Sequence, residues 1–145
     1  MSDYKSQQWV NAHGPFSGHR AYVRKNVSLA AVPRAKYPFT LLLSLIYRSK
    51  AEDGTPCEAG EMQRLDRTEE GVADRFCNGH GALFGLVVTS DGTRDIFLFL
   101  PQRPDDACVD AEIQGANPEV DYSFEIIHDP AWRPYEHILA QDRES

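Results

Sequence analysis

Two segments of the chain are apolar at almost every position, rather than at every second one. They are residues 41–46 and 96–100, in which Ser44 is the one polar residue. Continuous apolar runs of this length are typical of strands buried on both faces, and such strands lie inside a sheet rather than at its edge. The pattern therefore predicts two central strands, at about 39–48 and 94–100.

A helix is predicted after the first of these strands. Thr55 and Glu58 have the spacing of a capping box, and Pro56 suits the first helical position. A modest stripe of apolar residues follows at helical spacing, as far as about Phe76. We therefore expect a helix over 55–76.

The second half of the chain predicts a hairpin, a short helix and a last strand. The Asp-Gly pair at 91–92 is typical of a tight turn between strands, here 83–89 and 94–100. Asp105 or Asp106 is expected to cap a short helix that ends at Gly115. Residues 122–127 then alternate as a half-exposed strand.

The order strand, helix, strand, strand, helix, strand predicts an α+β fold. In a split βαββαβ arrangement the first and third strands are central, and these are the two apolar runs. We expect a ferredoxin-like sandwich over 37–145. Residues 19–27 suit an exposed strand that pairs with 5–12, with a break at 13–15, and 28–38 reads as a loop. Residues 1–36 are thus predicted as an N-terminal β-hairpin extension packed on the core, within one structural domain.

The third core strand presents large side chains on both faces. Phe97 and Phe99 point away from Ile96 and Leu98, and a sheet whose helices all lie on one face would leave one of these pairs uncovered. We therefore expect the N-terminal hairpin to extend the sheet or to fold under it, with help from Trp132 and Tyr135.

Composition narrows the class of protein. The 145 residues are 41% hydrophobic, as in globular domains, and contain no apolar stretch near the roughly 18 residues that a membrane helix needs. The first residues lack the apolar core of a signal peptide, so we expect a cytoplasmic protein without membrane association. Its three cysteines are widely spaced and odd in number, which favours reduced thiols over a disulfide framework or a zinc site.

Charge is distributed unevenly along the chain. Residues 1–50 carry a net charge of +7 and residues 51–145 carry −14, which gives −7 overall. A basic segment can bind nucleic acid, but here an acidic body would repel phosphates within the Debye length of roughly 8–10 Å. We favour a basic N-terminal layer beside an acidic body, and we do not expect nucleic acid as the partner.

The sequence contains no motif that specifies a chemistry. Nucleophile, P-loop and dinucleotide-binding signatures are absent, and no histidine spacing is that of a metal site, so no catalytic residue, metal or cofactor is predicted. Two alternatives stay open. One is a hydrolase or ligand-binding domain with a pocket near His80, His128 and Trp132; the other is an RNA-binding domain that requires exposed Phe97 and Phe99.

Two motifs carry a resemblance to a known family. Residues 89–99 match T-x-D-G-x-R-x-x-x-x-Y/F, and residues 129–139 match D-P-x-W-x-x-Y-x-x-x-L. With these motifs in this order, residues 37–140 resemble bacterial domain-of-unknown-function family 695. The resemblance implies no established activity. It implies an association in some proteins with a domain similar to the regulator of RNase E activity B, which inhibits an endoribonuclease.

Our leading hypothesis is therefore a non-enzymatic domain that regulates another protein by binding it, as an inhibitor or adaptor, with a nuclease as one partner class; a toxin-immunity protein is an alternative. The partner and the oligomeric state are left open. Acidic faces steer association with basic partners. Trp132, Arg133 and Tyr135 are expected to form either a closing clasp or a binding anchor. The candidate partner-binding residues are Asp66, Glu69, Glu70, Asp74, Asp106 and Asp110.

Overall fold

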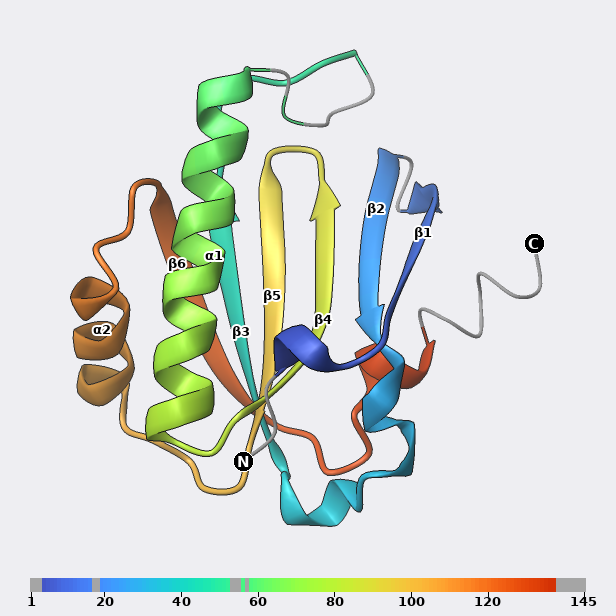
Figure 1. Ribbon diagram of the computed structural model, residues 1–145, viewed down its shortest axis with the longest axis vertical. Coiled ribbons are helices and arrows are strands. Elements are labelled where there is room, and N and C mark those ends of the chain that lie inside the picture. The colour runs from blue at the N-terminus through green and yellow to red at the C-terminus, as the bar shows by residue number, and fades with distance from the viewer. Residues whose placement is uncertain (1–3, 17–18, 53–55, 57, 138–145) are drawn as a thin grey trace.

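The computed structural model describes residues 4–16, 19–52, 56 and 58–137. These residues form an α+β structure with one six-stranded antiparallel sheet (Figure 1). The strands are β1 Trp9–Phe16, β2 His19–Asn26, β3 Phe39–Ile46, β4 Leu83–Ser90, β5 Thr93–Leu100 and β6 Asp121–His128. The helices are α1 Ala59–Gly79 and α2 Asp106–Gly115, with short 3-10 helices at Tyr4–Ser6, Val27–Ala31 and Arg34–Lys36.

The two continuous apolar runs occupy inner positions of the sheet, as predicted. The strand order is β1-β2-β4-β5-β3-β6, so β5 lies between β4 and β3, and β3 lies between β5 and β6. An inner strand has its backbone groups paired on both sides and can bury both faces. β3 and β5 therefore bring apolar side chains to two separate cores.

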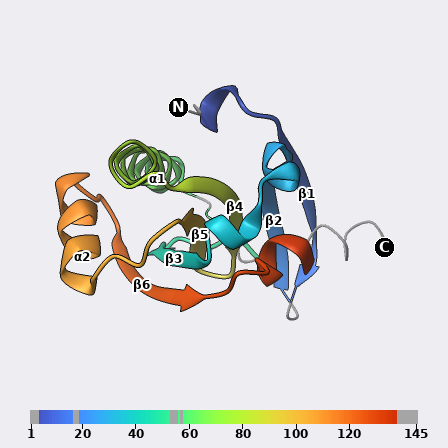
Figure 2. The same cartoon turned by 90° about the horizontal axis from the view of Figure 1, so that it is seen from below.

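The first core lies beneath the helices. α1 and α2 pack on the same face of the sheet, where alternate residues of β3 and β5 are buried. Figure 2 shows α1 on one side of the sheet and the chain after β6 passing on the other. The buried residues of this core include Leu41, Leu43, Leu45, Ile96 and Leu98 of the sheet, Leu65, Val72 and Phe76 of α1, and Val109 and Ile113 of α2.

The second core covers the opposite face, and Phe97 and Phe99 lie in it. Their exposed fractions are 7% and 0%. The hairpin extends the sheet, because β2 pairs with β4, while Leu29, Trp132 and Tyr135 pack against the phenylalanine rings. The prediction that these rings are covered is confirmed.

Two glycines permit the geometry of the β4–β5 hairpin. At Gly85 the register shifts, and a Cβ there would lie 2.3 Å from Phe99 Cε2 and 3.2 Å from Leu29 Cδ1. No side chain fits that space. In the turn, Asp91 and Gly92 have φ values of 42° and 98°, the left-handed conformations that the Asp-Gly pair predicted.

The first helix begins and ends later than the sequence predicted. α1 starts at Ala59, and its N-cap, Glu58, makes no side-chain capping hydrogen bond. Pro56 forms an isolated β-bridge with Lys50, so it is not the first helical residue. Thr55, the other half of the expected capping box, lies outside the described residues.

Glu61 anchors the start of α1 instead. Its Oε1 accepts hydrogen bonds from the backbone N–H groups of Arg48 (3.0 Å) and Ser49 (2.7 Å) and from the Ser49 hydroxyl (2.6 Å). These bonds, that from the hydroxyl above all, lower the pKa of Glu61. Because the donors lie beyond the end of β3, a pattern confined to the helix does not reveal this contact.

The expected break at 13–15 is also wrong, because β1 continues through Phe16 with Pro15 opposite Arg20. β1 is an edge strand, and edge strands are where sheets tolerate proline, because an N–H on their outer side has no partner strand. The other predicted boundaries agree more closely: Asp105 caps α2 by accepting from the Cys108 N–H, and Gly115 ends it.

In the part of the chain that the structure describes, no helix combines the length and apolar character needed to cross a bilayer.

Candidate functional site

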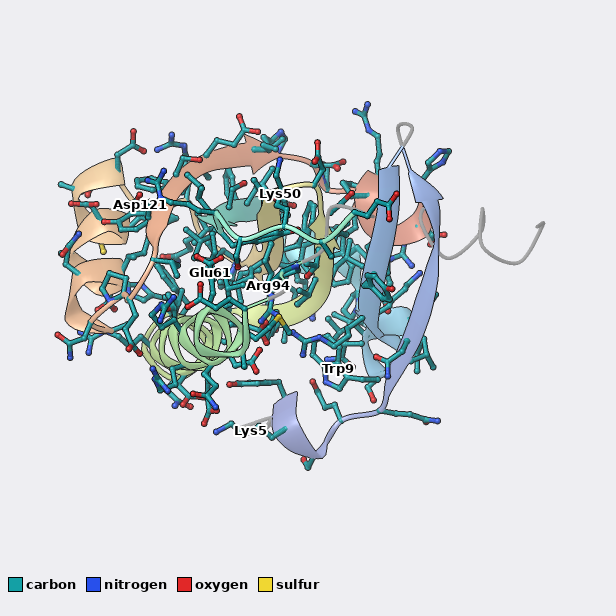
Figure 3. All side chains as sticks on the ribbon, turned by 90° about the horizontal axis from the view of Figure 1, so that it is seen from above. Lys5, Trp9, Lys50, Glu61, Arg94 and Asp121 are labelled. Atoms are coloured by element: carbon teal, nitrogen blue, oxygen red, sulfur yellow. The ribbon has the colours of Figure 1, made fainter. Side chains whose placement is uncertain are left out.

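A groove lies between α1 and the β1–β2 hairpin. The hairpin stands steeply against the rest of the sheet (Figure 2), and Arg94 lies between it and α1 (Figure 3). Two hollows, of about 490 and 550 Å³, share Arg24, Met62 and Arg94 and together form the groove. The first is also lined by Asn11, Ala12, Tyr22, Val23, Pro56 and Thr89, and the second by Tyr4, Lys5, Asp66, Glu69 and Glu70.

Strand register builds the groove floor. Tyr22 of β2 is opposite Thr89 of β4, and Thr89 is opposite Arg94 of β5. Directly opposed residues project from the same face, so the three form a row across the sheet on the side that carries α1. Met62 of α1 lies over Arg94 at one end of this row, and Tyr22 is 42% exposed at the other.

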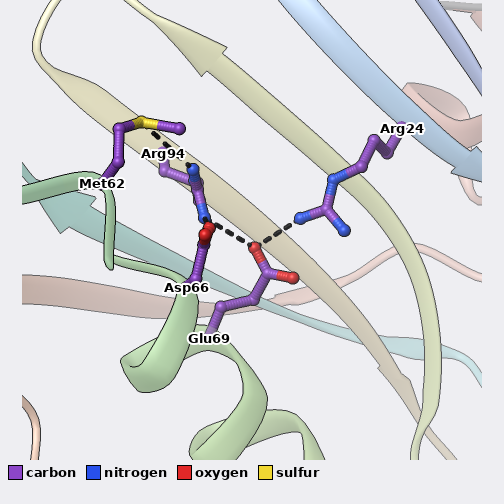
Figure 4. A network of polar contacts seen from close by, with 5 residues as sticks. All are labelled: Arg24, Met62, Asp66, Glu69 and Arg94. Atoms are coloured by element: carbon purple, nitrogen blue, oxygen red, sulfur yellow. Dashed lines mark hydrogen bonds and ion pairs between the residues drawn. The ribbon is translucent and has the colours of Figure 1, made fainter. Parts of the chain in front are cut away.

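A network of charges crosses the groove (Figure 4). Arg94 Nη1 donates to Asp66 Oδ1 at 2.7 Å and to Glu69 Oε1 at 3.1 Å, and Arg24 Nη2 donates to the same Glu69 oxygen at 2.5 Å. The Arg94 and Glu69 side chains are 6% and 10% exposed. A buried charge is tolerated only with its partner. Glu69 of α1 has two such partners, Arg24 of β2 and Arg94 of β5, and so connects the helix with the hairpin and with β5.

One edge of the Arg94 guanidinium is almost without acceptors. Arg94 Nε is buried with no hydrogen-bond partner among the described residues, and Nη2 meets only Met62 Sδ, at 3.9 Å. A thioether is a weak acceptor. A buried donor that lacks an acceptor destabilises the folded protein by about 1–3 kcal/mol. The floor of the groove therefore holds hydrogen-bonding capacity that this chain itself uses poorly.

The six acidic residues predicted to bind a partner do not form one free surface. Glu69 is only 8% exposed and is bound by two arginines, so its side chain is not on the surface as expected. Asp66 pairs with Arg94 at the edge of the groove. The other four contact, in order, Lys5 (Glu70), Lys5 and Tyr4 (Asp74), Arg103 (Asp106) and Tyr122 (Asp110).

The N-terminal segment is held against α1 through two of these acids. Lys5 Nζ lies 2.9 Å from Glu70 Oε1, and Tyr4 Oη donates to Asp74 Oδ1 at 2.8 Å. Burial, together with the Asp74 carboxylate, raises the pKa of Tyr4, so the phenol stays a donor. The basic start of the chain thus packs beside acidic residues of α1.

Trp132 and Tyr135 lie in the interior, with exposed fractions of 0% and 1%. Trp132 stacks on Phe99 with ring centroids 4.0 Å apart, and its Nε1 donates to the Tyr37 carbonyl at 2.8 Å. Tyr135 Oη donates to the Asn26 carbonyl at 2.6 Å, and burial raises the pKa of this phenol to about 12. The Arg133 side chain, by contrast, is 84% exposed. Of the three residues, only Arg133 is presented to solvent.

The alternative pocket near His80, His128 and Trp132 does not assemble. His80 Nε2 contacts Glu112 at 2.6 Å between the two helices, His128 lies against Phe39 at the end of β6, and Trp132 belongs to the opposite core. The described residues contain no group of three side chains placed to hold a metal ion. Burial raises the pKa of the Cys77 thiol to about 12, which makes it a poor nucleophile.

Sequence reasoning did not find the groove. Arg24, Met62, Thr89 and Arg94 are not among the candidate site residues that the sequence predicts. One signal was present: Arg94 occupies an inward position on a strand that is otherwise apolar on that face. A charged residue there needs partners, and those partners come from elements distant in the sequence.

Comparisons with known proteins place the chain in a family. No curated protein and no solved structure matches the sequence. Residues 7–140, nearly the whole chain, match the Family of unknown function (DUF695), so the resemblance expected from residues 37–140 is confirmed and extends through the N-terminal hairpin. The chain therefore belongs to the Family of unknown function (DUF695).

Proposed function

We propose that this domain is a non-enzymatic regulator that binds another protein, and that the partner binds in the groove between α1 and the β1–β2 hairpin. The observation that carries this proposal is the edge of Arg94 that lacks strong acceptors on the groove floor. Folded proteins pair nearly all buried polar groups, so such a group is a reason to look for a ligand.

The chemistry of the groove walls supports a protein partner. The apolar side chain of Met62 and the aromatic side chain of Tyr22 lie beside polar groups that can orient a bound chain. Tyrosine and arginine are the residue types that most often carry binding energy at protein interfaces. Both are present here, and Tyr22 is one of two large hydrophobic residues that the described part of the chain exposes.

Electrostatics support a basic partner. The net charge of −7 and the exposed acids of both helices, Glu70, Asp106 and Asp110 among them, attract positively charged proteins over distances near the Debye length. Binding that covers the partner's own active site is the proposed mode of regulation, with a nuclease as the model partner. A toxin-immunity role uses the same chemistry.

We also propose a ferredoxin-like fold for residues 37–145 and a cytoplasmic location. The order β4-β5-β3-β6, with α1 and α2 on a shared face, supports a ferredoxin-like unit to which β1 and β2 are added. Action in the cytoplasm stays a prediction. RNA stacking on Phe97 and Phe99 receives no support, because both rings are buried.

A small-molecule ligand is the second candidate. A hollow of about 490 Å³ falls within the size range of small-molecule sites, roughly 300–1,000 Å³. A metabolite that copurifies with the domain would favour this candidate over a protein partner.

Affinity capture from the native host with two matched variants tests the proposal. Tyr22→Ala changes the groove rim, and Ile127→Ala changes the other exposed large hydrophobic residue, on β6 at the far edge of the sheet. We expect one protein to be recovered with wild type and with Ile127→Ala, but about tenfold less with Tyr22→Ala. Equal recovery by all three chains would show that the partner binds outside the groove. Recovery of nothing above background would contradict a protein-binding function.

A further inference from the structure

The Nε–Nη2 edge of Arg94 is the part of the groove floor with unused hydrogen-bonding capacity. A guanidinium has five N–H donors in a planar fork, and Nε and Nη2 lie along the same edge. Nη1 is used by Asp66 and Glu69, while the Nε–Nη2 edge meets only a thioether sulfur. The edge is shaped for one oxygen that accepts both hydrogen bonds, or for two oxygens in parallel.

The charge of the groove favours a neutral acceptor over an anionic one. Arg24 and Arg94 are already balanced by Asp66 and Glu69, and Lys5 is outnumbered by Glu70 and Asp74. A bound carboxylate or phosphate would add a further negative charge to this cluster in a chain of net charge −7. An uncharged carbonyl oxygen has two lone pairs and accepts both donors without repulsion.

Met62 is the movable part of the site. Its thioether lies over the guanidinium and lines both hollows. Methionine is unbranched and adapts its shape readily, so its sulfur can leave Nη2 when a stronger acceptor arrives. The same side chain then offers an apolar surface beside the acceptor, in the hollow that Tyr22 also lines.

From these contacts we infer that the groove binds an extended segment of its partner through a main-chain carbonyl held by the Nε–Nη2 edge of Arg94, with the neighbouring apolar side chain against Met62 and Tyr22. This inference rests on the proposed function and names the recognition chemistry of the same site. The occupant is an uncharged stretch of peptide rather than an acidic motif or a chain terminus.

The test uses two probes that differ only in charge at the acceptor. Acetyl-leucine methylamide offers neutral carbonyls and an apolar side chain, and acetyl-leucine offers the same side chain with a carboxylate. Each is titrated into the full chain while the Arg94 Nε–H resonance is followed by nitrogen-15 NMR. We expect the neutral probe to shift that resonance at about fivefold lower concentration than the charged one, because the carboxylate meets like charges.

Two variants isolate the roles of Met62 and Arg94. Met62→Ala uncovers the guanidinium and should lower the concentration of neutral probe needed for half the shift, while Gln63→Ala, an exposed neighbour on α1, should leave it unchanged. Arg94→Lys keeps the charge but removes the two-donor edge, so groove resonances such as that of the Thr89 N–H should stop responding to the probe. If Arg94→Lys does not fold, the wild-type Arg94 resonance and the Met62 pair still decide the outcome.

Three results overturn the inference. Tighter binding of acetyl-leucine or inorganic phosphate would show an anion site. Equal responses in Met62→Ala and Gln63→Ala would remove Met62 from the site. An Arg94 Nε–H resonance that no probe shifts would mean that this edge recognises nothing. If Tyr22→Ala still loses the captured protein while that resonance stays unmoved, the proposed function stands and only the carbonyl recognition fails.

Discussion

Two arginines on opposite faces of the sheet have different kinds of partner. The Cζ atom of Arg34 lies 5.5 Å from the ring centroids of both Trp132 and Tyr135, and the side chain forms an ion pair with Glu136. Arg94 is more deeply buried, yet one of its edges meets only a thioether. One face is therefore closed by the chain's own aromatic residues (the closed face), whereas a groove lies along the other.

The largest expected effect lies on the closed face. Trp132→Ala removes a fully buried indole that stacks on Phe99. We expect a loss of about 3–5 kcal/mol of unfolding free energy, measured by urea denaturation, because truncation of a buried tryptophan leaves a cavity. Ile127→Ala, at a 37% exposed position, is the control and should change stability far less. A loss no greater than that of the control would show that the clasp does not hold the fold.

Glu69→Ala should have the second-largest effect on stability, because it removes the carboxylate that Arg24 and Arg94 share in the groove. It leaves Arg94 with Asp66 as its remaining carboxylate partner and Arg24 without its bond to α1. Breaking a buried pair typically destabilises a protein by about 3–5 kcal/mol, and the partial exposure of Arg24 places this variant near the lower end. Chemical denaturation measures the loss, and Glu70→Ala, whose partner is the exposed Lys5, is the matched control.

Tyr135→Phe gives a smaller effect on the closed face. It keeps the ring and removes only the hydroxyl that donates to the buried Asn26 carbonyl. An unpaired buried acceptor predicts a loss of about 1–3 kcal/mol in the free energy of unfolding. The same variant should leave probe binding at Arg94 unchanged, since the two sites lie on opposite faces; a parallel loss of both would mean that the faces are coupled.

The smallest effect is expected from Asp95→Asn. Burial raises the pKa of Asp95, although the Ser44 hydroxyl donates to its Oδ1 at 2.8 Å. A raised pKa favours the native state when the carboxyl is protonated, and this contribution is lost as the pH rises through the pKa of the folded protein. The amide should therefore stabilise the protein at pH 7, and the gain should vanish in acid below the carboxyl's usual pKa. Thermal unfolding from pH 3 to 7 measures it, and a gain independent of pH would contradict the explanation.

Local patterns predicted most of the fold because the residues that decide it are neighbours in sequence. The runs in β3 and β5 and the turn at Asp91 and Gly92 each carry their own signal. The contact that fixes the start of α1 did not, since Glu61 is held by Arg48 and Ser49 across a loop. The groove escaped prediction for the same reason on a larger scale. Arg24, Met62 and Arg94 come from three elements: the register of β2, β4 and β5 brings the two arginines to one face, and the packing of α1 on that face adds Met62.

Gly85 ties the choice of residue at one position to that at another. The space where its side chain would stand holds the edge of the Phe99 ring and a methyl group of Leu29. Any larger residue at 85 would displace that ring, which stacks on the Trp132 indole. Family members that replace this glycine should therefore carry a smaller residue where Phe99 stands, so that the two positions change together through evolution.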